Sequence, residues 1–135
     1  MRVMVLVKAT EESEAGVMPT TGELDAMTSF NEELAAAGVM LAGEGLHPSA
    51  RGRRIRFGGA APLVLDGPFA ETKELVAGFW LWQVASMQEA LDWAKRAPFR
   101  SGELELRPVF ESEEFGDELT PDLRAREAEL RRKQG

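Results

Sequence analysis

The chain has 135 residues, of which 44% are hydrophobic and 29% are charged, and this composition is typical of one globular domain. Its formal net charge of −7 argues against nucleic acid as the main partner, because phosphate binding needs a concentrated positive surface. The chain contains no cysteine, which excludes disulfides and thiolate chemistry, and its apolar run Val3–Val7 is too short for a signal sequence or a membrane span. We therefore expect a cytoplasmic protein.

The N-terminal part of the chain predicts a strand followed by a helix. Residues 2–8 are apolar on both alternating sets, which is typical of a central strand covered on both faces. A polar loop is expected over residues 10–19. Thr20 and Glu23 then form a capping-box pattern, which begins a helix with one apolar stripe. Gly38 stands in the usual position for ending that helix.

The next part predicts a strand and a β-hairpin. Residues 39–42 resume as a strand and lead into Gly43 and Gly45, where two glycines indicate a bulge or a close backbone approach. Residues 53–57 and 62–65 are separated by glycines and alternate in character, so they predict the two arms of a hairpin.

The C-terminal part predicts a strand, a helix, a strand and a charged tail. Residues 77–84 form the most hydrophobic strand, and the helix over residues 87–95 begins with a second capping box. Residues 103–107 alternate cleanly, which favours a strand near an edge of the sheet. Residues 111–118 are acidic and loop-like, and residues 121–135 predict a charged helix with a thin apolar stripe.

This order predicts an α+β fold of the ferredoxin-like split βαβ type, with an inserted hairpin and a C-terminal helix. Two helices cover only one face of such a sheet, yet the strand over residues 77–84 has Trp80 and Trp82 on one side and Phe79 and Leu81 on the other. An open face bearing two tryptophans would be an apolar patch that monomers rarely tolerate. We therefore expect a homodimer in which the open sheet faces pack together.

The stretch Asp66–Glu74, DGPFAETKE, ends an apolar strand abruptly. Its glycine and proline favour a rigid turn, and the Asp66 carboxylate can accept hydrogen bonds from nearby backbone N–H groups. This stretch resembles the signature of the DGPF proteins, the YCII-related domain family. The segment Gly43-Glu44-Gly45-Leu46 and the pair Gly78-Phe79 also look like the family pattern.

The resemblance covers residues 1–110 and implies a dimeric α/β-barrel fold in a bacterial protein, with residues 111–135 outside it as an acidic linker and a charged helix. Members of the family largely lack an assigned reaction. In small YciI-type relatives, a histidine and an aspartate on the first helix have been proposed as an acid/base pair. The first helix here, Thr21 to Ala37, has no histidine, and its only aspartate is Asp25, so this pair cannot be carried over.

Three residues are candidates for acid/base chemistry. Asp66 stands at a strand end, where it could act as a general base or bind a ligand donor; the alternative is that it bonds only the backbone of its own turn. His47 is the single histidine and the readiest proton shuttle, or else a surface residue before Pro48. Glu44 lies three residues earlier, a spacing that places the two side chains on opposite faces of an extended chain unless a bulge at Gly45 realigns them.

The candidate ligand-binding residues are Arg54, Arg56, Phe69, Glu71 and Lys73. The arginines can bind a carboxylate or phosphate through paired hydrogen bonds, or else form the solvated face of the hairpin. The two charged residues can line the rim of a pocket closed by the phenylalanine, or else be exposed charges on a short turn. One histidine and scattered carboxylates match no metal-ligand spacing, and no cofactor is predicted.

The leading hypothesis is a homodimer that binds a small polar or anionic molecule in a cleft lined by the Asp66 turn, residues 43–47 and the arginines, with weak acid/base activity as an open question. The alternative comes from the resemblance, because many relatives are encoded beside extracytoplasmic-function sigma factors. An accessory regulatory protein would then act through protein contacts of its charged tail. Neither hypothesis involves a membrane.

Overall fold

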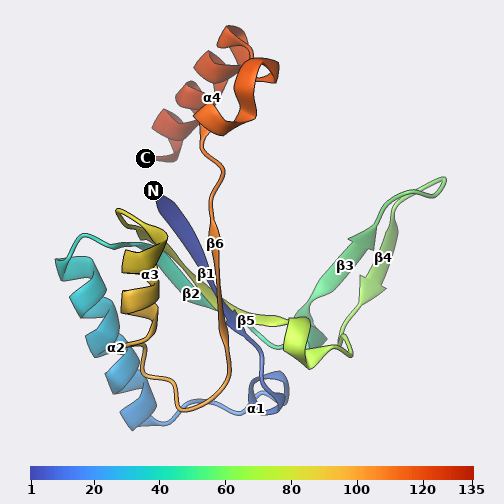
Figure 1. Cartoon of the computed structure of the whole chain (residues 1–135). Helices are drawn as coiled ribbons and strands as arrows, with labels where there is room; N and C mark the ends of the chain where they lie inside the picture. The colour runs from blue at the N-terminus through green and yellow to red at the C-terminus, as the bar shows by residue number, and fades with distance from the viewer.

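A computed structural model describes the whole chain, residues 1–135, as an α+β protein in which helices cover one face of an antiparallel sheet (Figure 1). A hairpin and a C-terminal helical unit project from this body. In chain order the elements are β1 (Arg2–Lys8), α1 (Glu11–Glu14), α2 (Thr21–Ala36), β2 (Met40–Gly45), η1 (Ser49–Arg51), β3 (Arg53–Arg56), β4 (Leu63–Asp66), η2 (Thr72–Glu74), β5 (Val76–Gln83), α3 (Met87–Ala94), β6 (Leu104–Pro108), η3 (Ser112–Glu118) and α4 (Pro121–Gln134).

The main sheet has the strand order β2-β5-β1-β6, and every neighbouring pair is antiparallel. The central place of β1 and the edge place of β6 confirm two predictions made from their hydrophobic patterns. β3 and β4 pair only with each other, in a separate two-stranded sheet. The predicted hairpin is therefore present, and it forms no ladder with the main sheet.

The helix ends follow the local sequence. The Thr20 hydroxyl accepts a hydrogen bond from the Glu23 N–H, and the Glu23 carboxylate accepts one from the Thr20 N–H, which lowers the pKa of Glu23. Gly38 follows α2 with a φ of 72°, the left-handed conformation that glycine adopts most readily. At α3 the Ser86 hydroxyl accepts a hydrogen bond from the Glu89 N–H. The Glu89 carboxylate accepts one from the N–H of Ala85, the residue before the cap.

The hydrophobic core lies between the sheet and the two long helices. Val3, Val5 and Trp82 on the strands and Leu34 on α2 are fully buried. Trp80 belongs to the same cluster, 5.8 Å from the Phe30 ring in an edge-to-face arrangement. The expectation of an open face bearing the tryptophans is therefore wrong, because α2 and α3 pack on that face.

The opposite face of the sheet is the one that the helices leave open. Strand register and alternation place Met4 and Leu6 of β1 and Phe79 and Leu81 of β5 there, and all four are only partly buried. Near the end of this strip, Lys8 lies 3.5 Å from the Glu105 carboxylate. The open face carries an apolar strip, as expected, but this strip has no tryptophan and is bordered on β6 by Glu105 and Arg107, the register partners of Leu6 and Met4.

Three local expectations need correction. Thr10 and Ser13 form a capping box that begins the short helix α1 inside the predicted loop. The acidic stretch after Glu111 is the 3₁₀ segment η3 instead of a loop, and a positive φ at Gly116 kinks it. In β2 the irregular register falls between Met40 and Ala42, before the two glycines, whereas the alternative of a close approach is confirmed at Gly43, where a Cβ would lie 2.7 Å from Trp80 Cδ1. None of the helices is long and apolar enough to cross a bilayer.

Candidate functional site

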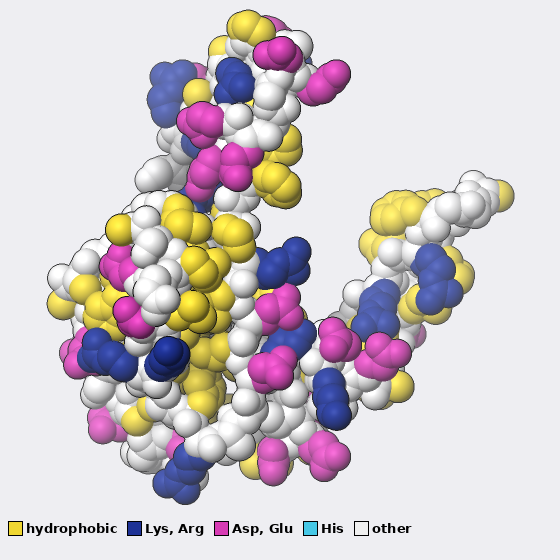
Figure 2. Space-filling model, viewed as in Figure 1, with side chains coloured by type: hydrophobic (Ala, Val, Ile, Leu, Met, Phe, Trp, Pro, Cys, Tyr) yellow, Lys and Arg dark blue, Asp and Glu magenta, His cyan; other side chains and the backbone are white.

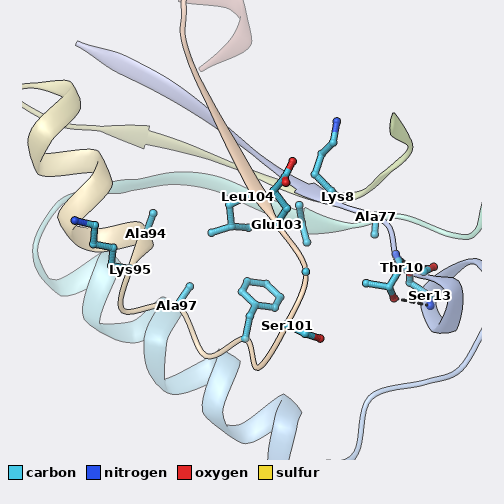
Figure 3. A pocket seen from close by; sticks show the side chains of 13 residues that line it. Lys8, Thr10, Ser13, Ala77, Ala94, Lys95, Ala97, Ser101, Glu103 and Leu104 are labelled. Atoms are coloured by element: carbon cyan, nitrogen blue, oxygen red, sulfur yellow. Dashed lines mark hydrogen bonds between the residues drawn. The ribbon is translucent and has the colours of Figure 1, made fainter. Parts of the chain in front are cut away.

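Two adjoining cavities lie beside the C-terminal end of β1, next to the loop that follows α3. Figure 3 shows the larger one. Their volumes are 410 and 240 Å³, and both are lined by Val7, Ala77 and Phe99. The larger one is also lined by Lys8, Thr10, Ser13, Ala94, Lys95, Ala97, Ser101, Gly102, Glu103 and Leu104. The smaller one is also lined by Met27, Asn31, Gly43, Glu44, Gly45, Gly78, Phe79 and Trp80.

The larger cavity has polar groups on opposite sides of apolar walls. Figure 3 shows Thr10 and Ser13 on one side and Lys95 on the other. The two hydroxyl residues are held by their capping box, in which the Thr10 N–H donates to Ser13 Oγ at 2.8 Å. Ser101 adds a third hydroxyl, and Lys8, Lys95 and Glu103 add charges of both signs. A small molecule with an apolar part and a polar end matches this lining.

The smaller cavity is organised by a hydrogen bond between α2 and β5. Trp80 Nε1 donates to Asn31 Oδ1 at 2.9 Å, so the amide oxygen of Asn31 is occupied and its NH₂ group remains a donor. A Cβ at Gly43 would lie 2.7 Å from Trp80 Cδ1, so only glycine leaves room for the indole there. Glu44 belongs to the same lining, but it pairs with Phe79 across the β2–β5 ladder, so its exposed side chain projects from the helix-free face of the sheet.

The turn after Asp66 joins the hairpin to the body. The Gly67 N–H donates to the Gly52 carbonyl at 3.1 Å, and a Cβ at Gly67 would lie 1.8 Å from the Ser49 carbonyl oxygen. Ser49 Oγ accepts from the Phe69 N–H at 3.0 Å, while the Ser49 N–H donates to the Glu14 carboxylate at 2.9 Å. The turn is therefore packed tightly against η1, which α1 in turn holds.

Asp66 itself faces solvent beside the hairpin. Its carboxylate lies 3.0 Å from Arg53 Nε across the β3–β4 ladder, and 78% of its side chain is exposed. Arg54 stacks on the Phe69 ring at 3.9 Å, and Arg56 is exposed near the hairpin tip. None of these residues lines the two cavities.

The remaining predicted site residues lie in separate places. The His47 ring is in contact with Arg51, whose Nη1 atom lies 3.1 Å from His47 Nε2. Glu71 and Lys73 line a more open hollow of 580 Å³ between η2 and the start of α1. Of the eight predicted residues, only Glu44 lies in the two joined cavities, so one protomer does not assemble the predicted cleft.

Sequence reasoning did not single out Asn31, Trp80, Phe99 or Lys95 as site residues. A signal for Asn31 was present, because it stands four residues after Met27 and three before Leu34 on the apolar stripe of α2. Phe99 and Lys95 had no comparable signal, because the loop after α3 reaches the cavity only in the folded chain.

The model of the YCII-related domain matches residues 1–113. The chain belongs to the YCII-related family. The matched region of this YCII-related protein ends within three residues of the boundary expected at residue 110, and the C-terminal helix lies outside it.

A relative from Rhizobium meliloti (strain 1021), described as the uncharacterized protein R00369, is 42% identical over 67 residues. The aligned region covers 47% of the YCII-related chain and 54% of that relative, so the match spans about half of each. A solved structure is similar with a TM-score of 0.44 and 13% identity, covering 84% of this chain and 98% of the other. It is the 5-chloro-2-hydroxyhydroquinone dehydrochlorinase from Burkholderia phenoliruptrix AC1100, in complex with 2,5-dihydroxybenzoquinone.

The ionisable groups of the domain show no metal-binding geometry, since no three His, Asp or Glu side chains form a group that could hold an ion. Besides Glu23, one further carboxylate outside the cavities has a lowered pKa. Arg2 donates two hydrogen bonds to Glu111, at 3.0 and 3.1 Å, and these bonds lower the pKa of Glu111. This pair ties the end of β6 to the start of β1.

Proposed function

We propose that this YCII-related protein is a homodimer that binds a small polar or anionic organic molecule in the two joined cavities around Phe99. The supporting observation is the lining of these cavities, where apolar walls stand between the charge of Lys95, the hydroxyls of Ser101 and Thr10, and the amide of Asn31. Pockets of this kind bury the apolar part of a ligand and orient it through a few polar groups.

Of the predicted catalytic residues only Glu44 belongs to the lining, since Asp66 and His47 lie elsewhere. Glu44 pairs with Phe79 in the β2–β5 ladder, so its carboxylate projects from the helix-free face of the sheet, away from Asn31. We therefore assign ligand binding to the cavities, with the Asn31 NH₂ group as a donor to an oxygen of the ligand, and assign no proton-transfer step there.

Thermal unfolding with inorganic phosphate and with benzoate tests the site. We expect at least one of these anions to raise the melting temperature, and we expect the Lys95→Met variant to lose that shift. Asp66→Ala is the matched control, because Asp66 is an exposed charged residue outside the cavities. A shift that survives Lys95→Met and disappears in Asp66→Ala would move the site to the DGPF turn. No shift with either anion would count against an anion site.

The strand order of the main sheet supports the proposed fold and the proposed assembly. Two β-α-β halves with the order β2-β5-β1-β6 support a ferredoxin-like arrangement, in which one sheet face remains free of helices. The partly buried strip of Met4, Leu6, Phe79 and Leu81 is the surface we assign to the homodimer. Sedimentation equilibrium of Leu81→Asp tests this assignment, and we expect the variant to be monomeric at micromolar concentrations.

A regulatory role beside an extracytoplasmic-function sigma factor is the second candidate. The observation that favours it is the C-terminal helix α4, which has no buried residue and a strongly charged surface. Deletion of residues 117–135 separates the two functions. Loss of sigma-factor capture, with the anion-induced melting shift unchanged, would support regulation.

A further inference from the structure

The hairpin arm, residues 53–66, exposes large apolar side chains on both of its faces. Ile55 and Val64 are cross-strand neighbours on one face and are 56% and 60% exposed, while Leu63 on the other face is 54% exposed. Phe57 beyond the end of β3 is 75% exposed. A two-stranded hairpin alone is marginally stable in water, and such a density of exposed apolar groups marks an interaction surface.

The hairpin arm is also basic where it is most apolar. From residue 53 to residue 64 its charged residues are Arg53, Arg54 and Arg56, with no acidic residue among them. Arg53 is paired with Asp66, and Arg54 stacks on Phe69. Arg56 is exposed beside Leu63, its neighbour across the ladder. A surface that covers this arm should therefore combine apolar groups with negative charge.

The C-terminal unit, residues 110–134, has those two properties. Phe110 and Phe115 are 68% and 54% exposed, and their rings lie 5.3 Å apart beside a cavity of 320 Å³. Residues 110–122 include six acidic residues and no basic one: Glu111, Glu113, Glu114, Asp117, Glu118 and Asp122. Glu111 is engaged by Arg2, and the others surround the two phenylalanines along the chain.

The two surfaces are far apart in one protomer. Figure 1 shows the hairpin and α4 projecting from the body in different directions, both away from α2 and α3. Figure 2 shows hydrophobic side chains on each of these projections. One chain therefore cannot bring its own hairpin onto its own C-terminal unit without leaving this fold.

We propose that the hairpin arm of one copy docks on the Phe110–Phe115 surface of a second copy, and that the second copy returns the same contact. The complementary charges on the two surfaces select this occupant, because a basic apolar arm matches the acidic segment, residues 110–122, that carries the two phenylalanines on the same chain. Reciprocal contact closes the assembly at two copies, as in other two-fold dimers. The inference rests on the homodimer of the proposed function and is independent of its ligand cavities.

Charge reversal on each surface tests this exchange. The hairpin variant is Arg54→Glu with Arg56→Glu, and the tail variant is Glu113→Arg with Asp117→Arg. All four residues are exposed, so both variants should keep the native circular dichroism spectrum. We expect each variant alone to raise the dimer dissociation constant by about 10-fold or more at low salt, with a smaller effect at high salt.

Mixing the two variants gives the decisive measurement, made by sedimentation velocity at low salt. A heterodimer pairs the reversed hairpin with the reversed tail, and its other contact pairs two native surfaces, so we expect tight association in the mixture. Arg100→Glu, an exposed arginine in the loop after α3 and outside both surfaces, is the control and should leave the dissociation constant unchanged.

Unchanged dissociation constants in both variants would overturn the proposed exchange of hairpin arms. The homodimer through the open sheet faces would then stand, and the Phe110–Phe115 surface would be assigned to a different protein. Weak association that the mixture does not restore would also overturn the exchange. A wild-type chain that sediments as a monomer would overturn the exchange together with the homodimer.

Discussion

The body and the two projecting parts of this chain use hydrophobic residues differently. In the body, side chains such as Leu34 and Trp82 are fully buried between the sheet and the helices. In the hairpin and in α4 no residue is buried, although both contain large apolar side chains. The comparison indicates that the body determines the stability of the protomer, whereas the projecting parts have apolar surface available for association.

The largest expected effect is in the core of the body. Leu34→Ala removes a fully buried side chain, so we expect it to lower the free energy of unfolding by about 3 kcal/mol. Val64→Ala on the hairpin, where the side chain is mostly exposed, should change it by less than about 0.5 kcal/mol. Urea unfolding at concentrations that keep the chain monomeric gives both values. Equal losses would show that the hairpin is part of the cooperative core.

The second effect is at the joint between the two regions. In Gly67→Ala the new methyl group would overlap the Ser49 carbonyl oxygen, which lies 1.8 Å from the Cβ position. We expect a cost of about 2 kcal/mol, together with faster amide exchange in the hairpin. Gly59→Ala is the control, because its nearest neighbour is 3.8 Å away. Hairpin exchange rates that match those of the wild type would contradict the role of the turn as a joint.

The third effect separates two neighbouring indoles of the core. Trp80 Nε1 donates to Asn31, whereas Trp82 Nε1 is buried without a partner. Trp80→Phe leaves the Asn31 oxygen unpaired, while Trp82→Phe removes an unsatisfied donor. We therefore expect Trp80→Phe to be more destabilising by about 1 kcal/mol in thermal unfolding. The reverse order would mean that packing volume outweighs the hydrogen bond.

The smallest effect concerns the pair that links the C-terminal unit to the body. Hydrogen bonds from Arg2 lower the pKa of Glu111 in the folded state, so the pair stabilises the fold above the unfolded pKa of about 4.3. This contribution is lost as pH falls through the folded pKa. Because the pair is partly exposed, it should not exceed about 0.5 kcal/mol. An NMR titration of Arg2→Gln should show the pKa of Glu111 returning upward.

Much of the secondary structure could be predicted because local chemistry determines it. The capping pairs at Thr20 and Ser86, and the glycine after α2, mark helix ends through bonds within a few residues. The short helix α1 was missed although Thr10 and Ser13 form the same kind of cap. Its lack of an apolar stripe left no periodic signal.

Most residues of the candidate site could not be predicted from the sequence. Glu44 was named as a carboxylate three residues before the single histidine, and it belongs to the lining of the smaller cavity, although its side chain projects from the other face of the sheet. Asp66 was named from turn chemistry, but its carboxylate pairs with Arg53, while Gly67 and Phe69 make the contacts of the turn with Ser49. Lys95 and Phe99 reach the cavities from a loop, and no local pattern encodes which loop will cover which strand end.

The order of elements, the helix caps and the central place of β1 were determined by the sequence alone, since each depends on residue types at short and regular spacings. Only the tertiary structure decided which side of β5 meets the helices. Both sides of that strand are apolar, so a period of two residues cannot distinguish them; α2 and α3 cover the side with the two tryptophans and leave Phe79 and Leu81 open.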